Sequence, residues 1–363
     1  MRRAVAWAPP YQVLLAALGI AIGFLPGLPR LRLSSDLILA VFVPALVFEA
    51  ALNLDLGAVR KLARPVGLLA TAGVGISIGL VGVLVHLLLG LAWPSALVLG
   101  AILSPTDPIA VVAVVRRSGA PAELAALLEA ESLFNDGTGV AAYTVVLAAA
   151  AGAGFTAGSL ALGFLLIAGG GAVVGGLVGL AGAALVRRTR WAPLEVVVTM
   201  VVAYVSYALA TLAGASGVIS VVVAGLALAQ VGTWGPDTER WWARLAILLN
   251  VVLFTLIGIG LPGARVLASI APVLGGFAIL LAVRLLLVHI PGLGVRGRWR
   301  QLLWWGGVRG ALSVALALAS FGHPGVDPSV AVVAYGIVAL SLLIQGAGVR
   351  PAVRLLRLAE RPA

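Results

Sequence analysis

Long apolar runs, separated by short polar or basic stretches, repeat along the whole chain. A helix that crosses a bilayer needs about 20 predominantly apolar residues, and charges, proline and glycine mark where each run ends. The pattern predicts an all-α polytopic membrane protein with about 12 transmembrane helices. The twelve runs have the approximate limits 11–28, 36–54, 64–90, 94–115, 123–150, 158–186, 192–212, 216–231, 243–261, 264–290, 300–321 and 329–349.

The composition supports a membrane protein. Hydrophobic residues make up 62% of the 363 residues and charged residues only 10%, whereas a soluble domain is about half apolar and about a quarter charged. Cysteine is absent, which excludes disulfides, thiolate metal sites and a cysteine nucleophile. The net charge of +11 could indicate nucleic-acid binding, but arginines in loops that set the membrane topology explain it better. We expect no nucleic-acid partner and no cofactor.

Basic residues alternate along the predicted loops in a way that orients the chain. Twelve spans place both termini on one side. The termini and the loops on that side hold 19 Arg and Lys residues, whereas the opposite loops hold only Arg30, Arg32 and Arg265. The positive-inside rule therefore predicts cytoplasmic termini and a location in the cell (inner) membrane. The basic start, "MRRAVAWAPP", runs into the first span and is interpreted as uncleaved.

A few charged residues remain inside the predicted spans. Placing a charge in mid-bilayer costs at least about 2.5–3.5 kcal/mol, so such residues usually face a partner or a watery cavity. Glu129 and Glu195 lie near span ends and could simply reach the interface. The remaining residues are Glu49, Asp107, Glu131, Asp136, Arg284 and Arg309. Two ion pairs would leave two acids over, and an unpaired buried carboxylate either takes a proton or binds a cation. These properties suit a transporter.

The stretch "EAESLFNDGTGV" at 129–140 concentrates this chemistry. Ser132 and Asp136 are four residues apart, and so are Glu131 and Asn135, which places the two pairs on adjacent stripes of a helix. Ser132 and Asp136 can therefore offer oxygens to one small cation, because hard cations prefer carboxylate, hydroxyl and carbonyl ligands.

Two spans contain residues that interrupt a helix. Thr106 and Asp107 stand between two prolines in "LSPTDPIAV", and three glycines bracket Arg309 in "WGGVRGAL". Unwound backbone inside a membrane occurs only where it is buried or lines a cavity, and paired interruptions in two halves indicate inverted repeats with the binding site between them. We pair spans 3–5 with spans 10–12. Arg309 could compensate Asp107, or it could neutralise opposed half-helix dipoles.

Four motifs together, "VPALVFEAALNLDL", "LSPTDPIAV", "EAESLFNDGTGV" and "WGGVRGALSVALAL", resemble the monovalent cation:proton antiporter-1 family, the NhaP-like sodium/proton antiporters, from about residue 11 to 350. The resemblance implies two broken helices crossing near mid-membrane and an essential carboxylate, Asp136, that binds Na⁺ or a proton. It implies that Asn135 orients the site and that Ser132, the Thr106 carbonyl and Glu49 contribute to it. It also implies that Glu131 pairs with Arg284, and it implies electroneutral exchange.

The resemblance further implies a homodimer in which each chain consists of two structural parts. The transport core corresponds to about 64–150 and 264–350, and the dimerisation scaffold to about 11–54 and 158–261. Many members have thirteen spans, and here the first span resembles the family's second. The chain is therefore expected to be a twelve-span variant or to lack a first helix. Its end, "VRLLRLAERPA", suggests that no regulatory domain follows.

Other functions remain open at this point. An organic-anion or other sodium-coupled symporter could share the broken-helix architecture, although an acid-rich site suits an anion poorly. A channel needs a continuous pore, and nothing here repeats to build a symmetric filter. A membrane protease could use Asp107 and Asp136 as paired acids, but we expect a transporter rather than an enzyme. Na⁺ is the expected cation, with Li⁺ or K⁺ as alternatives.

Overall fold

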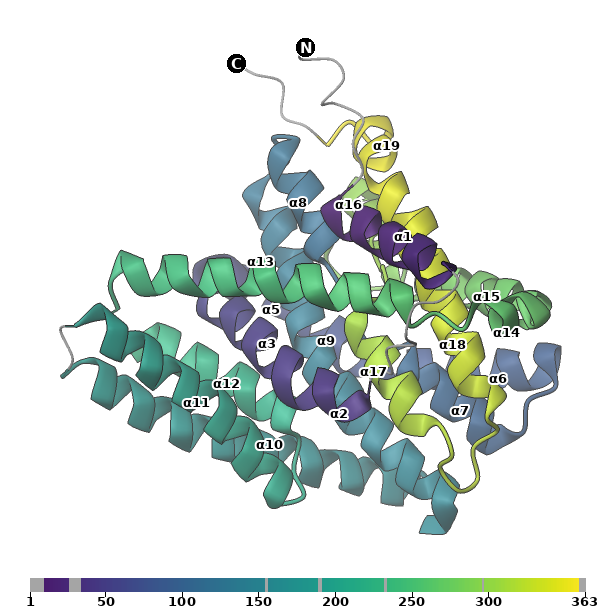
Figure 1. The fold of residues 1–363 in the computed structure, drawn as a ribbon, viewed down its shortest axis with the longest axis horizontal. Helices are drawn as coiled ribbons and strands as arrows, with labels where there is room; N and C mark the ends of the chain where they lie inside the picture. The colour runs from purple at the N-terminus through teal and green to yellow at the C-terminus, as the bar shows by residue number, and fades with distance from the viewer. Residues whose placement is uncertain are drawn as a thin grey trace.

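The computed structural model describes residues 10–25, 34–153, 156–188, 191–231, 234–295 and 297–358. The predicted all-α class is confirmed, since these residues form helices and connecting turns and no strand (Figure 1). Several charges used to orient the chain, such as Arg30, Arg32 and Arg190, lie outside the described residues, as do both chain ends.

Each predicted span falls on one helix or on a consecutive group of helices. In the first half these are α1 (Tyr11–Gly23), α2 (Ser35–Leu37), η2 (Ile38–Phe42), α3 (Val43–Leu52), α4 (Leu56–Lys61), α5 (Ala63–Ala70), α6 (Ala72–Leu89), α7 (Trp93–Ile102), α8 (Ile109–Arg117), α9 (Ala122–Ala148) and η3 (Ala149–Ala153). The second half contains α10 (Ala157–Val186), α11 (Ala192–Leu212), α12 (Gly217–Val231), α13 (Pro236–Ile259), α14 (Gly263–Ala268), α15 (Ile270–Val288), α16 (Gly297–Trp305), α17 (Ala311–Ser320), α18 (Ser329–Leu340), η4 (Ser341–Gly346) and α19 (Ala347–Leu355).

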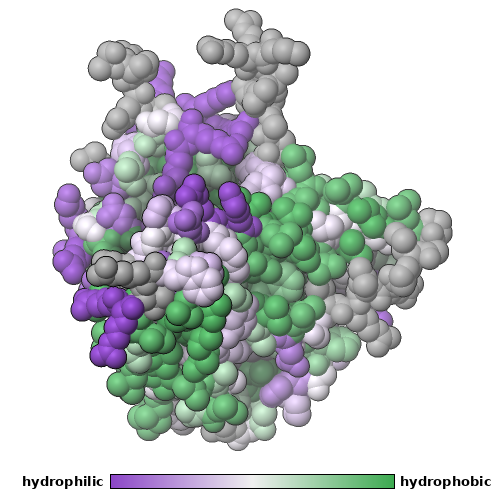
Figure 2. Space-filling model, turned by 60° about the vertical axis from the view of Figure 1, so that its left-hand side comes forward, coloured by the Kyte–Doolittle hydropathy of each residue, from purple (hydrophilic) through white to green (hydrophobic). Residues whose placement is uncertain are grey.

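The helices are suited to a bilayer. Within the described residues, seven helical stretches are long and apolar enough to cross a membrane, and four shorter helices are also apolar. Apolar side chains cover much of the visible surface in Figure 2, and hydrophilic ones gather toward one end of that view. The protein is a multi-pass membrane protein, while the total of twelve crossings stays a prediction.

Glycines allow several helices to pack at short distance. Along α10, a methyl group at Gly171, Gly175 or Gly179 would overlap backbone atoms of α12. A methyl group at Gly19 of α1 would likewise overlap the backbone of α13 around Gly258. Small residues at four-residue spacing let membrane helices approach closely, and α10 with α12 and α1 with α13 are extensive contacts of the fold.

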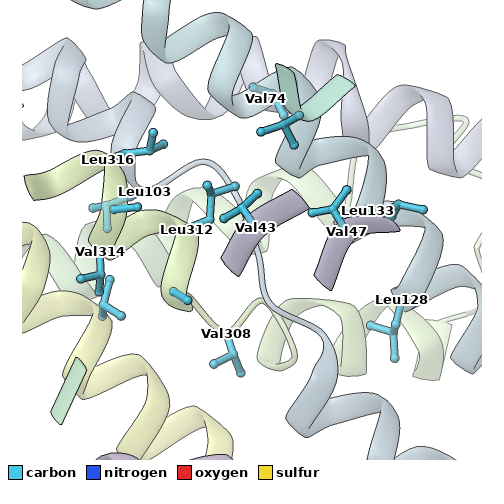
Figure 3. Close-up of a cluster of buried hydrophobic side chains, with 14 of the residues drawn as sticks. Val43, Val47, Val74, Leu103, Leu128, Leu133, Val308, Leu312, Val314 and Leu316 are labelled. Carbon is cyan, nitrogen blue, oxygen red and sulfur yellow. The ribbon is translucent and has the colours of Figure 1, made fainter. Parts of the chain in front are cut away.

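The two interrupted spans meet at the centre of the structure. Helix α7 ends at Ile102 and α8 begins at Ile109, whereas α16 ends at Trp305 and α17 begins at Ala311. The Asp107 N–H donates to the Val308 carbonyl at 2.7 Å, which joins the two unwound segments. Figure 3 shows Leu103 and Val308 from these segments among buried apolar side chains.

Candidate functional site

A cavity of about 640 Å³ lies beside the two helix interruptions. Its walls come from α3, α8, α9 and α13, from the segment between α7 and α8, and from the start of α17. The sequence-predicted residues on its wall are Glu49, Thr106, Asp107, Ser132 and Asp136. The other four candidates do not line the cavity; they are Asn135, Glu131, Arg284 and Arg309.

Two side chains of α9 hold the unwound segment at Thr106. The Thr106 N–H donates to Asn135 Oδ1 at 3.1 Å, and Asn135 Nδ2 donates to Thr106 Oγ1 at 2.7 Å. Ser132 Oγ donates to the Thr106 carbonyl oxygen. Buried backbone groups freed by unwinding need such partners. Asn135 thus positions the segment, while Ser132 and the Thr106 carbonyl also face the cavity.

Asp136 differs from these neighbours because its carboxylate has no partner. It is half-buried and lines the cavity. Among the described residues, it accepts no hydrogen bond and forms no ion pair. A carboxylate with free lone pairs on a cavity wall can accept a proton or a cation from that cavity.

Arg309 and Asp107 each face a half-helix end of opposite sign. Arg309 Nη1 donates to the carbonyls of Ser104 and Pro105, just past the C-terminal end of α7, at 2.7 and 2.8 Å. The Asp107 carboxyl packs against Gly310 at the N-terminal end of α17, where a methyl group would overlap it. A helix is negative at its C-terminus and positive at its N-terminus. These contacts favour dipole neutralisation, since no Asp107–Arg309 ion pair occurs within the described chain.

Residues of the π-helix η4 form hydrogen bonds with the end of α16 and with the unwound segment between α16 and α17. The Arg309 N–H donates to Ser341 Oγ, which donates to Gln345 Oε1 at 2.6 Å. Gln345 Nε2 donates to the Trp305 carbonyl, and Trp305 Nε1 donates to the Gln345 carbonyl. Short π-helical turns often occur at functional sites. Our sequence reasoning missed this group, although Ser341 and Gln345, four apart in an apolar run, were a usable signal.

Glu131 of α9 and Arg284 of α15 form a buried ion pair outside the cavity lining. Arg284 Nη1 lies 2.6 Å from Glu131 Oε1, and the two side chains are 6% and 3% exposed, respectively. Arg284 also donates to the Leu303 carbonyl. This is the pairing that the family resemblance implies. Neither residue lines the cavity.

The three other glutamates considered in the sequence analysis have different surroundings. Glu49 of α3 lines the cavity and accepts from Asn53 Nδ2 at 2.8 Å. Glu129 also lines it and pairs with Arg116 at 2.7 Å in a partly exposed contact. The sequence allowed Glu195 simply to reach the interface, whereas the structure gives it hydrogen-bond partners within the protein. Glu195 is buried and accepts hydrogen bonds from the Gly235 N–H and Thr238 Oγ1, at the start of α13.

Two uncharged residues on the cavity wall also escaped the sequence reasoning. Asn250 of α13 and Ser313 of α17 are buried polar residues that line the same cavity. Charge was the criterion for selecting candidates, and neither residue carries any. The available signal was a polar side chain on an otherwise apolar helical stretch.

The carboxylates do not form a compact metal centre. Nowhere in the described part of the chain do three or more His, Asp or Glu side chains come close enough to hold a metal ion together. A cation held in this cavity would therefore need neutral oxygens for part of its coordination, and hard cations readily accept them.

The comparison with known families decides what kind of protein carries this site. The family model for the transmembrane sodium/hydrogen exchanger matches residues 8–355. The chain belongs to the sodium/hydrogen exchanger family. Members of this family are transporters, so this exchanger is not an enzyme.

Curated relatives agree with the family assignment. The exchanger is 34% identical over 359 residues to the Na⁺/H⁺ antiporter ApNhaP of Aphanothece halophytica, covering 93% of this chain and 68% of the relative. It is 36% identical to the Na⁺/H⁺ antiporter NhaP of Pseudomonas aeruginosa, covering 88% and 81%, respectively. The solved structure of the sodium proton antiporter MjNhaP1 from Methanocaldococcus jannaschii matches with a TM-score of 0.74 at 22% identity, covering 96% and 91%. The exchanger thus shares its fold.

Proposed function

We propose that the protein exchanges Na⁺ for protons across the membrane and that Asp136 is the group for which the two ions compete. The observation that carries this proposal is the unpartnered Asp136 carboxylate on the cavity wall. The named antiporter relatives support it. Li⁺ and K⁺ remain candidate substrates, because the ligand types are shared by all three cations.

Competition for one carboxylate couples the two fluxes. Deprotonated Asp136 takes a cation, and protonated Asp136 returns without one, as the cavity faces each side of the membrane in turn. One carboxylate exchanges one cation for one proton, so the cycle moves no net charge. A ligand that binds two states differently shifts the balance between them, and here either ion neutralises the carboxylate in the buried states.

The neighbouring oxygens supply the rest of the cation site. Ser132 Oγ, the Thr106 carbonyl and Glu49 stand on the same cavity wall. The Ser132 hydroxyl donates a hydrogen bond to the Thr106 carbonyl, but the hydroxyl oxygen and the carbonyl oxygen each keep a lone pair for a cation. The carboxylates of Glu49, Asp107 and Asp136 disfavour an organic anion in this cavity, so anion symport finds no support there.

Exchange is measured with the purified protein in liposomes that contain a pH-sensitive dye. Adding Na⁺ outside is expected to raise the internal pH, because each entering cation releases one proton. Clamping the membrane potential with K⁺ and valinomycin is expected to leave the rate unchanged. No Na⁺-dependent pH change would overturn the proposed function. A rate that follows the potential would overturn only the one-to-one stoichiometry.

We also propose that both termini face the cytoplasm, in the cell (inner) membrane. Arginines gather near the ends of α8 and α19, which lie at the same end of the molecule in Figure 1. Since the chain has no cysteine, Arg117→Cys and Phe321→Cys give clean single labels at exposed sites. A membrane-impermeant maleimide added to intact cells is expected to label Phe321→Cys alone. Labelling of Arg117→Cys alone would invert the topology.

The assembly is proposed to be a homodimer, with a scaffold of about 11–54 and 158–261 and a transport core of about 64–150 and 264–350. Support comes from α10, which exposes large apolar side chains along its length, including Leu162, Leu166, Val173 and Leu177. We expect the protein in detergent, after subtraction of the micelle, to have twice the 36.7 kDa mass of the chain. A single-chain mass at all detergent concentrations would contradict the dimer.

A further inference from the structure

Two residues of the cavity lining each carry a buried oxygen that has no hydrogen-bond partner in the described part of the chain. Asn250 is 5% exposed and Ser313 is fully buried. Among the described residues, neither Asn250 Oδ1 nor Ser313 Oγ makes a hydrogen bond. Both residues line the cavity that Asp136 lines. Leaving such a group unpaired is unfavourable, so their position calls for a ligand inside the cavity.

Polar neighbours on the same two helices behave differently. On α13, Thr255 Oγ1 donates to the Val251 carbonyl one turn earlier. On α17, Ser320 Oγ donates to the Ala317 carbonyl. This is the usual way for a hydroxyl in a helix to be satisfied. Neither Thr255 nor Ser320 lines the cavity, so on the described parts of these two helices the buried unpartnered oxygens belong to residues of the cavity wall.

The orientation of Asn250 indicates what kind of ligand it would take. Its Nδ2 donates to the Ala246 carbonyl of its own helix at 2.8 Å, which leaves Oδ1, an acceptor, as the free end. Ser313 Oγ offers lone pairs as well. These oxygens belong to a cavity that the carboxylates of Glu49, Asp107 and Asp136 also line, and such a lining favours a cation over an anion.

Helices α13 and α17 contact each other directly, so the two oxygens come from adjoining helices. Asn250 belongs to the proposed scaffold and Ser313 to the proposed core. Within the described ranges the carboxylates do not gather into a metal centre by themselves, so a cation would draw part of its coordination from neutral oxygens of this kind.

We propose that Asn250 Oδ1 and Ser313 Oγ form a cation-binding subsite in the cavity that Asp136 also lines, and that this subsite sets which alkali cation the protein prefers. This inference rests on the proposed exchange function and adds specificity-determining residues to it. Because its two oxygens come from the scaffold and the core, the subsite is complete only when these parts adjoin as they do here.

The test compares Asn250→Ala and Ser313→Ala with the wild type in proteoliposomes, titrating Na⁺, Li⁺ and K⁺ separately. We expect the apparent KM for Na⁺ to rise about fivefold to tenfold in each variant, as for the loss of one hydrogen-bond-strength contact. The ratio of the KM values for Na⁺ and Li⁺ is expected to change, whereas the maximal rate stays within about twofold.

Thermal unfolding in detergent gives a readout that a packing role would not produce. Without Na⁺, Ser313→Ala is expected to melt no lower than the wild type, because replacing an unsatisfied buried polar group with an apolar one is neutral or stabilising. Asn250→Ala also loses the hydrogen bond to the Ala246 carbonyl, so for this variant the informative quantity is the shift that Na⁺ produces. Raising the Na⁺ concentration is expected to stabilise the wild type by ligand linkage and the variants much less. Asn250→Leu, which keeps the side-chain volume, repeats the measurement if Asn250→Ala does not fold.

Matched controls are Thr255→Ala on α13 and Ser320→Ala on α17, whose hydroxyls are bonded within their own helices. Both are expected to keep wild-type KM values. If the wild type exchanges ions and both test variants retain its KM for all three cations, the subsite is overturned and the exchange function stands. Melting temperatures that drop in both test variants without Na⁺, with KM unchanged, would assign the two residues to packing. A wild type with no exchange would instead overturn the function itself.

Discussion

Replacing Asp136 with asparagine is expected to abolish Na⁺-dependent proton movement while leaving the protein folded. The amide has nearly the shape of the carboxylate, but it can neither carry the exchanged proton nor neutralise a cation. In the described structure, Asp136 makes no hydrogen bond and no ion pair that the substitution could break. Losing a buried charge without a partner removes a desolvation cost, so the melting temperature is expected to hold or rise.

The measurement uses the dye-loaded liposomes, with equal amounts of protein in each sample. Liposomes with Asp136→Asn are expected to show the same internal pH change as protein-free liposomes at every Na⁺ concentration. Asp237→Asn is the control, because Asp237 forms an exposed ion pair with Arg240 away from the cavity and its loss costs at most about 1 kcal/mol. Exchange by Asp136→Asn at more than a small fraction of the wild-type rate would place the proton on another group.

The apolar pattern predicted the helices because the length of an apolar run and its periodicity depend only on residues that are close together in the sequence. Helix boundaries were less predictable where polar residues extend a helix beyond its apolar run. The span predicted to start at residue 243 belongs to a helix that begins at Pro236. Proline in the first turn, followed by Asp237 and Glu239, is a favourable helix start, and it outweighs the drop in hydropathy.

The candidate site was predictable where chemistry was local and unpredictable where it depended on distant partners. The Pro-flanked Asp107 and the Gly-flanked Arg309 marked both interruptions, because these residue types act on the adjacent backbone. Their roles depended on which carbonyls and helix ends lie nearby. Arg309 reaches carbonyls about 205 residues away in the chain, and no spacing rule in one sequence can show this.

The same dependence on distant partners explains why the sequence did not predict the surroundings of Glu195 or the presence of Asn250 and Ser313 on the cavity wall. Glu195 has partners that the sequence could not indicate, because Gly235 and Thr238 are 40 and 43 residues away. Asn250 and Ser313 are neutral, and a buried neutral side chain usually bonds to its own helix. Only the three-dimensional structure shows that these two do not.

The described contacts divide the polar residues of α9 between two tasks. Asn135 and Ser132 fix the unwound segment through Thr106, whereas Asp136 stays free in the cavity. In the proposed mechanism, exchange at Asp136 would therefore take place beside a backbone that is already held by other groups. This arrangement lets one carboxylate change its ligand without losing the hydrogen bonds that maintain the interruption.

The largest stability effect is expected at the buried pair of Glu131 and Arg284. Removing one partner leaves the other charge buried and uncompensated, which costs about 3–5 kcal/mol. Arg284→Met is expected to cost more than Glu131→Gln, because Arg284 also donates to the Leu303 carbonyl at the end of α16. In the double variant, the second substitution removes the stranded charge, so its cost is expected to be smaller than the sum of the two.

Melting temperatures in detergent measure the effect, and the chain provides a matched control two residues away. Glu129→Gln changes the same residue type on the same helix, but the Glu129–Arg116 pair is partly exposed, at 25% and 61%, respectively, and such pairs contribute about 0–1 kcal/mol. We expect Glu131→Gln to lower the melting temperature by several degrees and Glu129→Gln to leave it nearly unchanged. Equal shifts in the two variants would mean that burial does not govern the cost, and additive shifts in the double variant would mean that Glu131 and Arg284 do not stabilise each other.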